Sequence, residues 1–191
     1  MVAMSTDLDF VVTLYPTPVL RKEAAPIEAF DAALEDKVRA MFDRMYKSQG
    51  VGLAAPQVGL KERILVINAS GDPEKADEEL ALVNPTIVEL FGEKTVMEEG
   101  CLSFPGIFAE VERPDGCKVR AQTPGGEEVE LTLEGFPSRV LQHEYDHLQG
   151  VLLVDRMSAA DKLRHRAALD DLIAQYKASQ APAPKKRMFR R

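Results

Sequence analysis

The chain has 191 residues, 45% of them hydrophobic and 29% charged, which is typical of one globular domain that buries its core without disulfides. Its formal net charge is −7, and this acidic excess argues against non-specific nucleic-acid binding by the fold itself. With only two cysteines the chain has no disulfide framework, so any special thiol is expected to be catalytic or metal-binding.

The two ends of the chain carry no membrane signal but differ in charge. The N-terminal segment has acidic residues and no basic region, and its apolar stretch is broken by Pro16 and Pro18, so we expect neither a signal peptide nor a membrane span. We therefore expect a cytoplasmic protein, translated from Met1 or Met4. The last seven residues, KKRMFRR, carry five positive charges. We predict one domain over residues 1–180 and a basic, disordered tail over 181–191.

Hydrophobic periodicity predicts three helices, over about 27–47, 137–148 and 159–178. Between the first two, β-forming residues alternate with turn residues. The predicted strands are Arg63–Asn68, Leu80–Val83, Thr86–Phe91, Ile107–Glu112, Cys117–Gln122 and Val129–Leu133. Connections this short leave no room for crossover helices, so the strands should pair antiparallel. The predicted fold is α+β, with mainly antiparallel sheets packed around the central helix 137–148, plus an N-terminal and a C-terminal helix.

The central helix carries the pattern His143-Glu144-Tyr145-Asp146-His147. Two histidines four residues apart lie one turn apart on one helix face, close enough for both imidazoles to bind one metal ion. Glu144 lies beside that face, where it can exchange a proton with a water molecule without being a ligand. A hydrolytic site of this kind uses three protein ligands, so one more ligand must come from elsewhere.

The third ligand is not fixed by the helix itself. A metzincin protease would place another histidine where this chain has Leu153, and His165 lies between two arginines on a polar helix face, which predicts a solvated side chain. Asp170 has no supporting spacing, and Cys117 begins an alternating strand pattern that predicts an inward-facing residue. Cys101 lies in a stretch bent by glycine and proline, where a thiol can be presented to a metal, and it is the favoured ligand.

Three separated motifs resemble those of peptide deformylases. They are residues 50–57 (GVGLAAPQ), 99–103 (EGCLS) and 142–147 (QHEYDH), and the resemblance runs from about Leu14 to about residue 175. It implies a metal-dependent hydrolase that removes the formyl group from the N-terminal formyl-methionine of newly synthesised proteins and releases formate. It also implies one Fe(II) ion per chain, replaceable by zinc, nickel or cobalt, with Cys101, His143 and His147 as ligands.

The resemblance also implies roles for other residues. Glu144 would be the acid and base, while the Gln57 amide and the Leu102 backbone N–H would bind the developing oxyanion. The substrate-binding positions would be Val51, Gly52, Met97, Gly100, Phe136 and Val140. Glu99 and Asp146 are candidates for orienting the imidazoles, or else for structural ion pairs with arginines such as Arg113 or Arg139. Some family members have an arginine where this chain has Ile107-Phe108, so preference beyond the methionine is not defined.

The resemblance implies a further partner, because a C-terminal helix and basic tail can dock on the ribosome, where RNA phosphates attract positive charge. We expect no membrane and no DNA partner. Two other classes compete with this reading. A metalloprotease would cleave unformylated peptides, and a non-catalytic metal-binding module would need a fourth ligand, for which Cys117 is the spare thiol.

Overall fold

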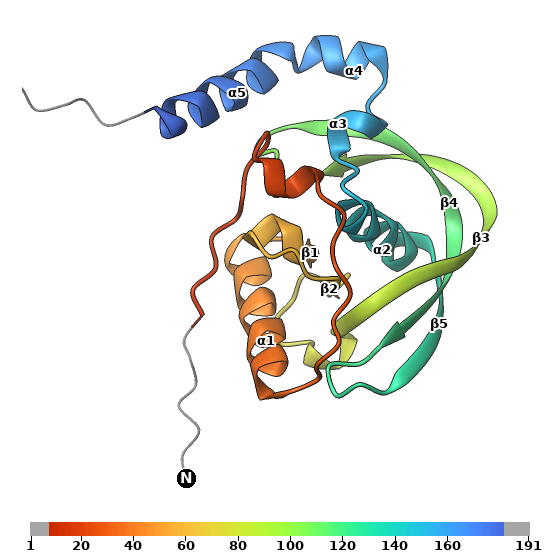
Figure 1. Ribbon diagram of the computed structural model, residues 1–191. Helices are drawn as coiled ribbons and strands as arrows, with labels where there is room; N and C mark the ends of the chain where they lie inside the picture. Colours follow the sequence, from red (N-terminus) through yellow and green to blue (C-terminus); the bar gives the residue numbers. More distant parts are fainter. Residues whose placement is uncertain (1–7, 182–191) are drawn as a thin grey trace, which may run out of the picture.

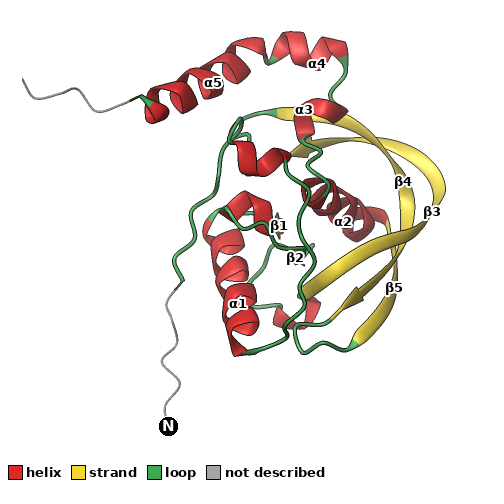
Figure 2. Ribbon diagram, viewed as in Figure 1, coloured by secondary structure: helices red, strands yellow, loops and turns green. Residues whose placement is uncertain are grey.

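The computed structural model describes residues 8–181 as one five-stranded antiparallel sheet with helices inside and outside its curve (Figures 1 and 2). The strand order is β1-β2-β3-β4-β5. The strands are β1 Gly52–Ala54, β2 Ile64–Ile67, β3 Leu80–Gly100, β4 Phe108–Gln122 and β5 Glu128–Glu134. The α-helices are α1 Ala32–Lys47, α2 Gly135–Leu148, α3 Leu153–Arg156, α4 Ala159–Arg164 and α5 Arg166–Gln180. Short 3-10 turns cover Pro18–Arg21, Ala55–Val58 and Ala76–Glu78. The predicted α+β class and antiparallel pairing are confirmed.

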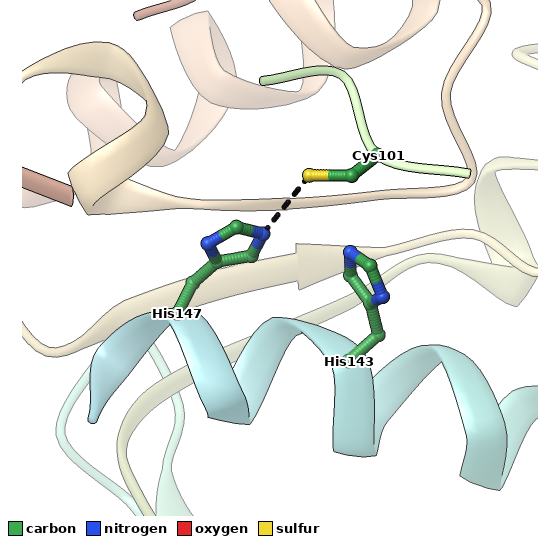
Figure 3. A group of neighbouring side chains, drawn as sticks. All are labelled: Cys101, His143 and His147. Carbon is green, nitrogen blue, oxygen red and sulfur yellow. Dashed lines mark hydrogen bonds between the residues drawn. The ribbon is translucent and has the colours of Figure 1, made fainter. Parts of the chain in front are cut away.

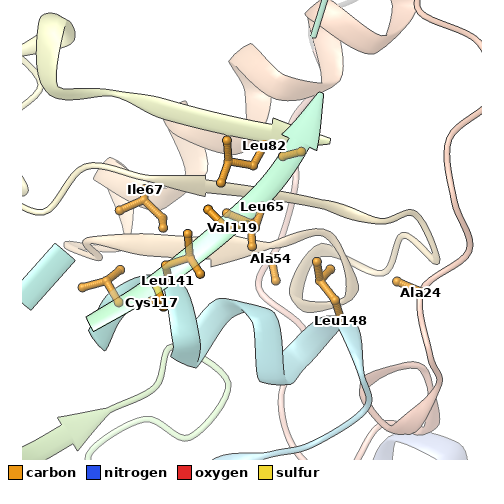
Figure 4. Close-up of a cluster of buried hydrophobic side chains, with 11 residues drawn as sticks. Ala24, Ala54, Leu65, Ile67, Leu82, Cys117, Val119, Leu141 and Leu148 are labelled. Atoms are coloured by element: carbon orange, nitrogen blue, oxygen red, sulfur yellow. The ribbon is translucent and has the colours of Figure 1, made fainter. Parts of the chain in front are cut away.

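Helix α2 lies at the centre, enclosed by the curved sheet (Figure 1). Its apolar side chains Leu141 and Leu148 are fully buried against Leu65 of β2 and Val119 of β4 (Figure 4). Full burial of one such side chain contributes roughly 1.5–3 kcal/mol. The helix predicted over 137–148 is therefore present, and its packing gives the histidines a rigid base.

Helix α1 covers β1 and β2 with one apolar face. Leu34, Val38, Met41 and Met45 recur at helical spacing and are buried in a second cluster. The helix begins after Asp31, whose carboxylate accepts a hydrogen bond from the Leu34 N–H at 3.0 Å. This cap explains why the helix starts later than the predicted residue 27, since it satisfies a backbone donor that the first helical turn leaves free.

Strands β3 and β4 form a long twisted hairpin, and the prediction of several short strands here was wrong. Residues 84–85 and 114–116, which separate the predicted strands, lie inside β3 and β4. Asn84 and Gly92 have positive φ angles of 53° and 78°, and the pairing register shifts between Phe91 and Lys94. Such bulges bend a strand without ending it. The bend carries the hairpin around α2 and brings the end of β3 to the histidines.

The C-terminal helix predicted over 159–178 is two helices, α4 and α5, which meet at His165. The predicted solvated position of His165 was wrong, since this junction half-buries its side chain. Leu172 is the one buried residue of α5, which extends away from the body of the protein (Figure 1). The tail predicted for 181–191 lies outside the described residues except for Ala181. Within residues 8–181, no helix combines the length and apolar character needed to cross a bilayer.

Candidate metal centre and active site

Three side chains of the types that bind metal ions converge from two parts of the chain. His143 and His147 rise from successive turns of α2, and Cys101 reaches them from the segment that follows β3 (Figure 3). The ligand atoms of the three residues lie within 4.8 Å of one another, and Cys101 Sγ is 3.3 Å from His147 Nε2. One thiolate and two imidazoles suit a borderline-soft divalent ion such as iron or zinc, so the residues present fit a metal ion.

The surroundings act on the two histidines in opposite directions. Burial alone would lower the pKa of His143, but hydrogen bonds with Cys101 and Glu99 outweigh it and raise the pKa above its usual value. His147 is 1% exposed, and burial, together with the nearby charges of His143 and Arg113, holds the pKa of His147 well below its usual value. A neutral imidazole is the form that binds metal. The Nδ1 atom of His143 lies 3.0 Å from Glu99 Oε2, which leaves its Nε2 for a ligand.

Glu99 is held in a buried ion-pair network. Arg113 donates to both of its oxygens at 2.7 and 2.9 Å, and Arg139 donates to Oε1 at 2.9 Å. Burial alone would raise the pKa of Glu99, but hydrogen bonds from His143 and Arg113 outweigh it and lower the pKa to about 2. The carboxylate therefore stays charged near neutral pH. The two alternatives for Glu99, orienting a histidine or pairing with an arginine, are both present in one contact network.

Glu144 lies beside the three ligands and is 4% exposed. Burial raises the pKa of Glu144 to about 7, a value suited to giving and taking protons near neutral pH. Its Oε2 atom has no hydrogen-bond partner within the described part of the chain. Gly52 makes room for it, since a Cβ atom there would lie 2.6 Å from Glu144 Oε1 and 2.9 Å from Val140 Cγ1.

Two hydrogen-bond donors face the same place. The Gln57 side chain is 1% exposed and its Oε1 accepts the Ala54 N–H at 2.8 Å. This contact turns the Gln57 Nε2 toward Cys101 Sγ and Ser103 Oγ, at 3.6 and 3.4 Å. Among residues 8–181 the Leu102 N–H donates to no other group. The Leu102 N–H is therefore available for a ligand oxygen, whereas the Gln57 Nε2 would exchange one of its two long contacts to donate to one.

A cavity of about 740 Å³ opens over these groups. It is lined by five of the six predicted substrate-binding residues: Val51, Gly52, Gly100, Phe136 and Val140. Met97 is not part of the lining, and its side chain is 44% exposed. The sequence did not mark Val12 or Phe104, which also line the cavity. Both residues lie outside the three motifs, and tertiary contacts bring them to the cavity wall.

The other candidate ligands lie apart from the centre. Cys117 is fully buried in the core cluster packed against α2, as its alternating pattern predicted. Cys101, His143 and His147 are the one group of three or more potential ligands that converges within residues 8–181. A fourth ligand from Cys117, which a closed structural site would require, finds no support in this arrangement.

Comparisons with known proteins agree with this site. The sequence profile of polypeptide deformylases matches residues 10–163. The chain belongs to the polypeptide deformylase family. A peptide deformylase of Thermotoga neapolitana is 48% identical over 161 residues, which is 84% of this chain and 94% of the relative. The chloroplastic/mitochondrial peptide deformylase 1B of Arabidopsis thaliana is 47% identical over 161 residues, 82% of this chain and 59% of the relative.

Solved structures extend the likeness to the fold. A crystal structure of the peptide deformylase from Plasmodium falciparum superposes with a TM-score of 0.87 at 42% identity, covering 90% of this chain and 100% of the other. The peptide deformylase of Thermotoga maritima gives a TM-score of 0.74 at 46% identity, covering 79% of this chain and 99% of the other. The family is metal-dependent and removes the N-terminal formyl group from nascent peptides.

Proposed function

We propose that this chain removes the formyl group from N-formylmethionyl peptides, with Cys101, His143 and His147 as metal ligands and Glu144 as acid and base. The observation that carries the assignment is the Glu144 carboxylate, which is buried, unpartnered at Oε2 and adjacent to the three ligands at the cavity floor. Burying a carboxyl group with an unpartnered oxygen costs stability, and a role in the reaction accounts for its presence here.

The three ligands would hold one divalent ion, and we propose Fe(II) as the ion bound in the cell, with zinc, nickel or cobalt as replacements. When bound, the ion would polarise the formyl oxygen and lower the pKa of water from 15.7 toward about 7. The soft Cys101 thiolate supports iron or zinc over magnesium or calcium. It also predicts that activity is lost in air, since both thiolate and Fe(II) oxidise.

The chain's own groups then move protons and hold charge. Glu144 takes a proton from the attacking water and returns it to the departing amine, which a carboxyl group with a pKa of about 7 can do in both directions. The Gln57 Nε2 and the Leu102 N–H donate hydrogen bonds to the formyl oxygen as negative charge develops there. The amine leaves as the free N-terminus of the peptide, and formate is released.

The substrate backbone is held beside β1. This strand ends the sheet, so its outer edge can pair with an extended peptide, except at the Ala54 N–H, which donates to Gln57 Oε1. Gly52 leaves no side chain between that edge and Glu144. The methionine side chain would enter the apolar part of the cavity, formed by Val51, Phe136 and Val140.

Residues 1–180 would form the single catalytic domain, and the free thiols of Cys101 and Cys117 suit the reducing cytoplasm. We also propose that α5 and the tail 181–191 dock on the ribosome. The five positive charges of KKRMFRR support this, because RNA phosphate attracts them in a salt-dependent way. Deleting residues 181–191 should abolish co-sedimentation with ribosomes at low salt, and unchanged co-sedimentation would contradict ribosome docking.

The activity is tested with protein prepared without oxygen and loaded with Fe(II) or Ni(II). Formyl-Met-Ala-Ser and unformylated Met-Ala-Ser-containing peptides are compared, with formate and new amino groups measured separately. Formate from the formylated peptide alone is the expected result. Internal cleavage of unformylated peptides would instead support the metalloprotease reading.

A further inference from the structure

We infer that Arg156 of α3 is a positioning residue for the metal centre, acting on His143 through a continuous chain of ion pairs. The inference rests on the proposed metal centre and extends it to the C-terminal part of the protein. The chain runs from Arg156 to Asp146, from Asp146 to Arg113, and from Arg113 to Glu99, which contacts His143.

The outer link is a two-nitrogen contact. Arg156 donates from Nη2 to Asp146 Oδ1 at 2.5 Å and from Nε to Oδ2 at 3.0 Å. This planar pairing fixes the direction of the Asp146 carboxylate more firmly than a single contact would. Arg156 also covers it, since the side chain of Asp146 is 12% exposed and that of Arg156 is 44% exposed.

The inner links are buried. Asp146 Oδ2 accepts from Arg113 Nη1 at 2.9 Å, and Arg113 uses its other two nitrogens for Glu99. Arg113 is 4% exposed and Glu99 is 7% exposed. In such surroundings charges interact strongly and unpaired groups are costly, so a displaced Asp146 would shift Arg113 and, through it, Glu99.

Arg156, the outermost residue of this series of ion pairs, lies on a helix that is itself held in place. α3 is anchored by Leu153, which is 2% exposed within the third core cluster. Asp155 accepts the Leu152 N–H at 2.8 Å and also pairs with Arg21. Arg156 and Asp146 border a groove of about 510 Å³ on the side of α2 away from the active-site cavity. The outer end of the ion-pair series is therefore open to water.

The test compares Arg156→Met with Arg164→Met, a matched control whose arginine pairs with Asp161 at 3.0 Å outside the chain of ion pairs. Dissociation constants for Co(II) and the cobalt–thiolate absorption are measured on purified full-length protein, with urea unfolding as a check of folding. Arg156→Met should weaken Co(II) binding by about 3- to 10-fold and alter the band, less than the 10- to 100-fold expected for losing a direct neighbour of a ligand. Arg156→Lys should fall between, because lysine keeps the charge but not the paired contact.

Passage of the effect through Glu99 is tested by combining variants. In a Glu99→Gln background, Arg156→Met should weaken Co(II) binding by less than about 2-fold, because the inner link is already altered. Equal Co(II) binding by wild type and Arg156→Met, or equal weakening by Arg164→Met, would overturn the inference while leaving the proposed reaction intact. Wild-type protein without a cobalt–thiolate band would overturn the proposed metal centre and this inference together.

Discussion

Replacing Arg113 by methionine should destabilise the fold far more than the same change at Arg120, although both arginines lie on β4 and both pair with glutamate. Arg113 is 4% exposed and makes three hydrogen bonds of 2.7 to 2.9 Å to Glu99 and Asp146. Arg120 contacts Glu130 at 2.7 Å, but these side chains are 70% and 48% exposed. The two arginines therefore differ in burial and in the number of hydrogen bonds that each makes.

Removing one partner of a buried ion pair costs about 3–5 kcal/mol, because the other charge remains buried. Glu99 would keep Arg139 and Asp146 would keep Arg156, so we expect the lower end, about 3 kcal/mol. With a urea dependence of about 1.5–3 kcal/mol per molar, the midpoint would fall by about 1–2 M.

The assay is urea unfolding followed by circular dichroism, with a chelator present so that metal affinity does not contribute to the difference. Arg120→Met should unfold at the wild-type midpoint, because water already solvates both of its charges. A difference below about 1 kcal/mol between the two variants would refute the argument that the buried network carries this stability.

Three further predictions concern the site. Gly52→Ala should lower kcat for deformylation at least about 10²-fold with metal content unchanged, because the new Cβ would lie 2.6 Å from Glu144 Oε1; wild-type kcat would contradict the close approach. Gln57→Leu should lower kcat by about 10²- to 10³-fold in steady-state assays, as loss of one oxyanion donor does, and a change in KM alone would argue against that role. Glu99 has a folded pKa of about 2 against a usual 4.5, so its stabilisation is complete above about pH 4.5 and is lost as pH falls toward 2. Unfolding midpoints of Glu99→Gln should therefore vary less across this window than wild type, and parallel curves would contradict the assignment.

The helix that carries the histidines was predictable because its signals are local. Apolar residues at 3.6-residue spacing fixed the buried face, and the histidine spacing then placed both imidazoles on one side. The structure brings Cys101 to them, as its bent glycine- and proline-containing surroundings suggested. Local sequence determines the helix and its histidine spacing, because both depend on residues one or two helical turns apart. The convergence of Cys101 with the histidines depends on the tertiary fold.

The long hairpin was not predictable in the same way. Asn84, Gly92 and the Pro114-Asp115-Gly116 stretch usually end strands, yet here they bend β3 and β4 around α2. Pairing over the whole length of the hairpin compensates for these irregularities, and that compensation exists only in the folded chain. The three-residue strand β1 was missed for a related reason, because pairing with β2 defines it.

The sequence did not predict that Arg113 and Arg139 are buried together with Glu99. Arg113 and Arg139 lie 14 and 40 residues from Glu99, so no periodicity connects them. Both were considered only as candidate ion-pair partners of Glu99 or Asp146. Met97 is a different case. The resemblance implied that it binds substrate, but its side chain lies outside the cavity lining.

The most direct test of the proposed mechanism is Glu144→Ala, measured for formate release and metal content in the same preparation. The Oε2 atom of this carboxylate has no hydrogen-bond partner among residues 8–181, so we expect no detectable formate from formyl-Met-Ala-Ser while one metal ion per chain remains bound. Formate release at the wild-type rate with metal bound would contradict the central claim that Glu144 carries the proton.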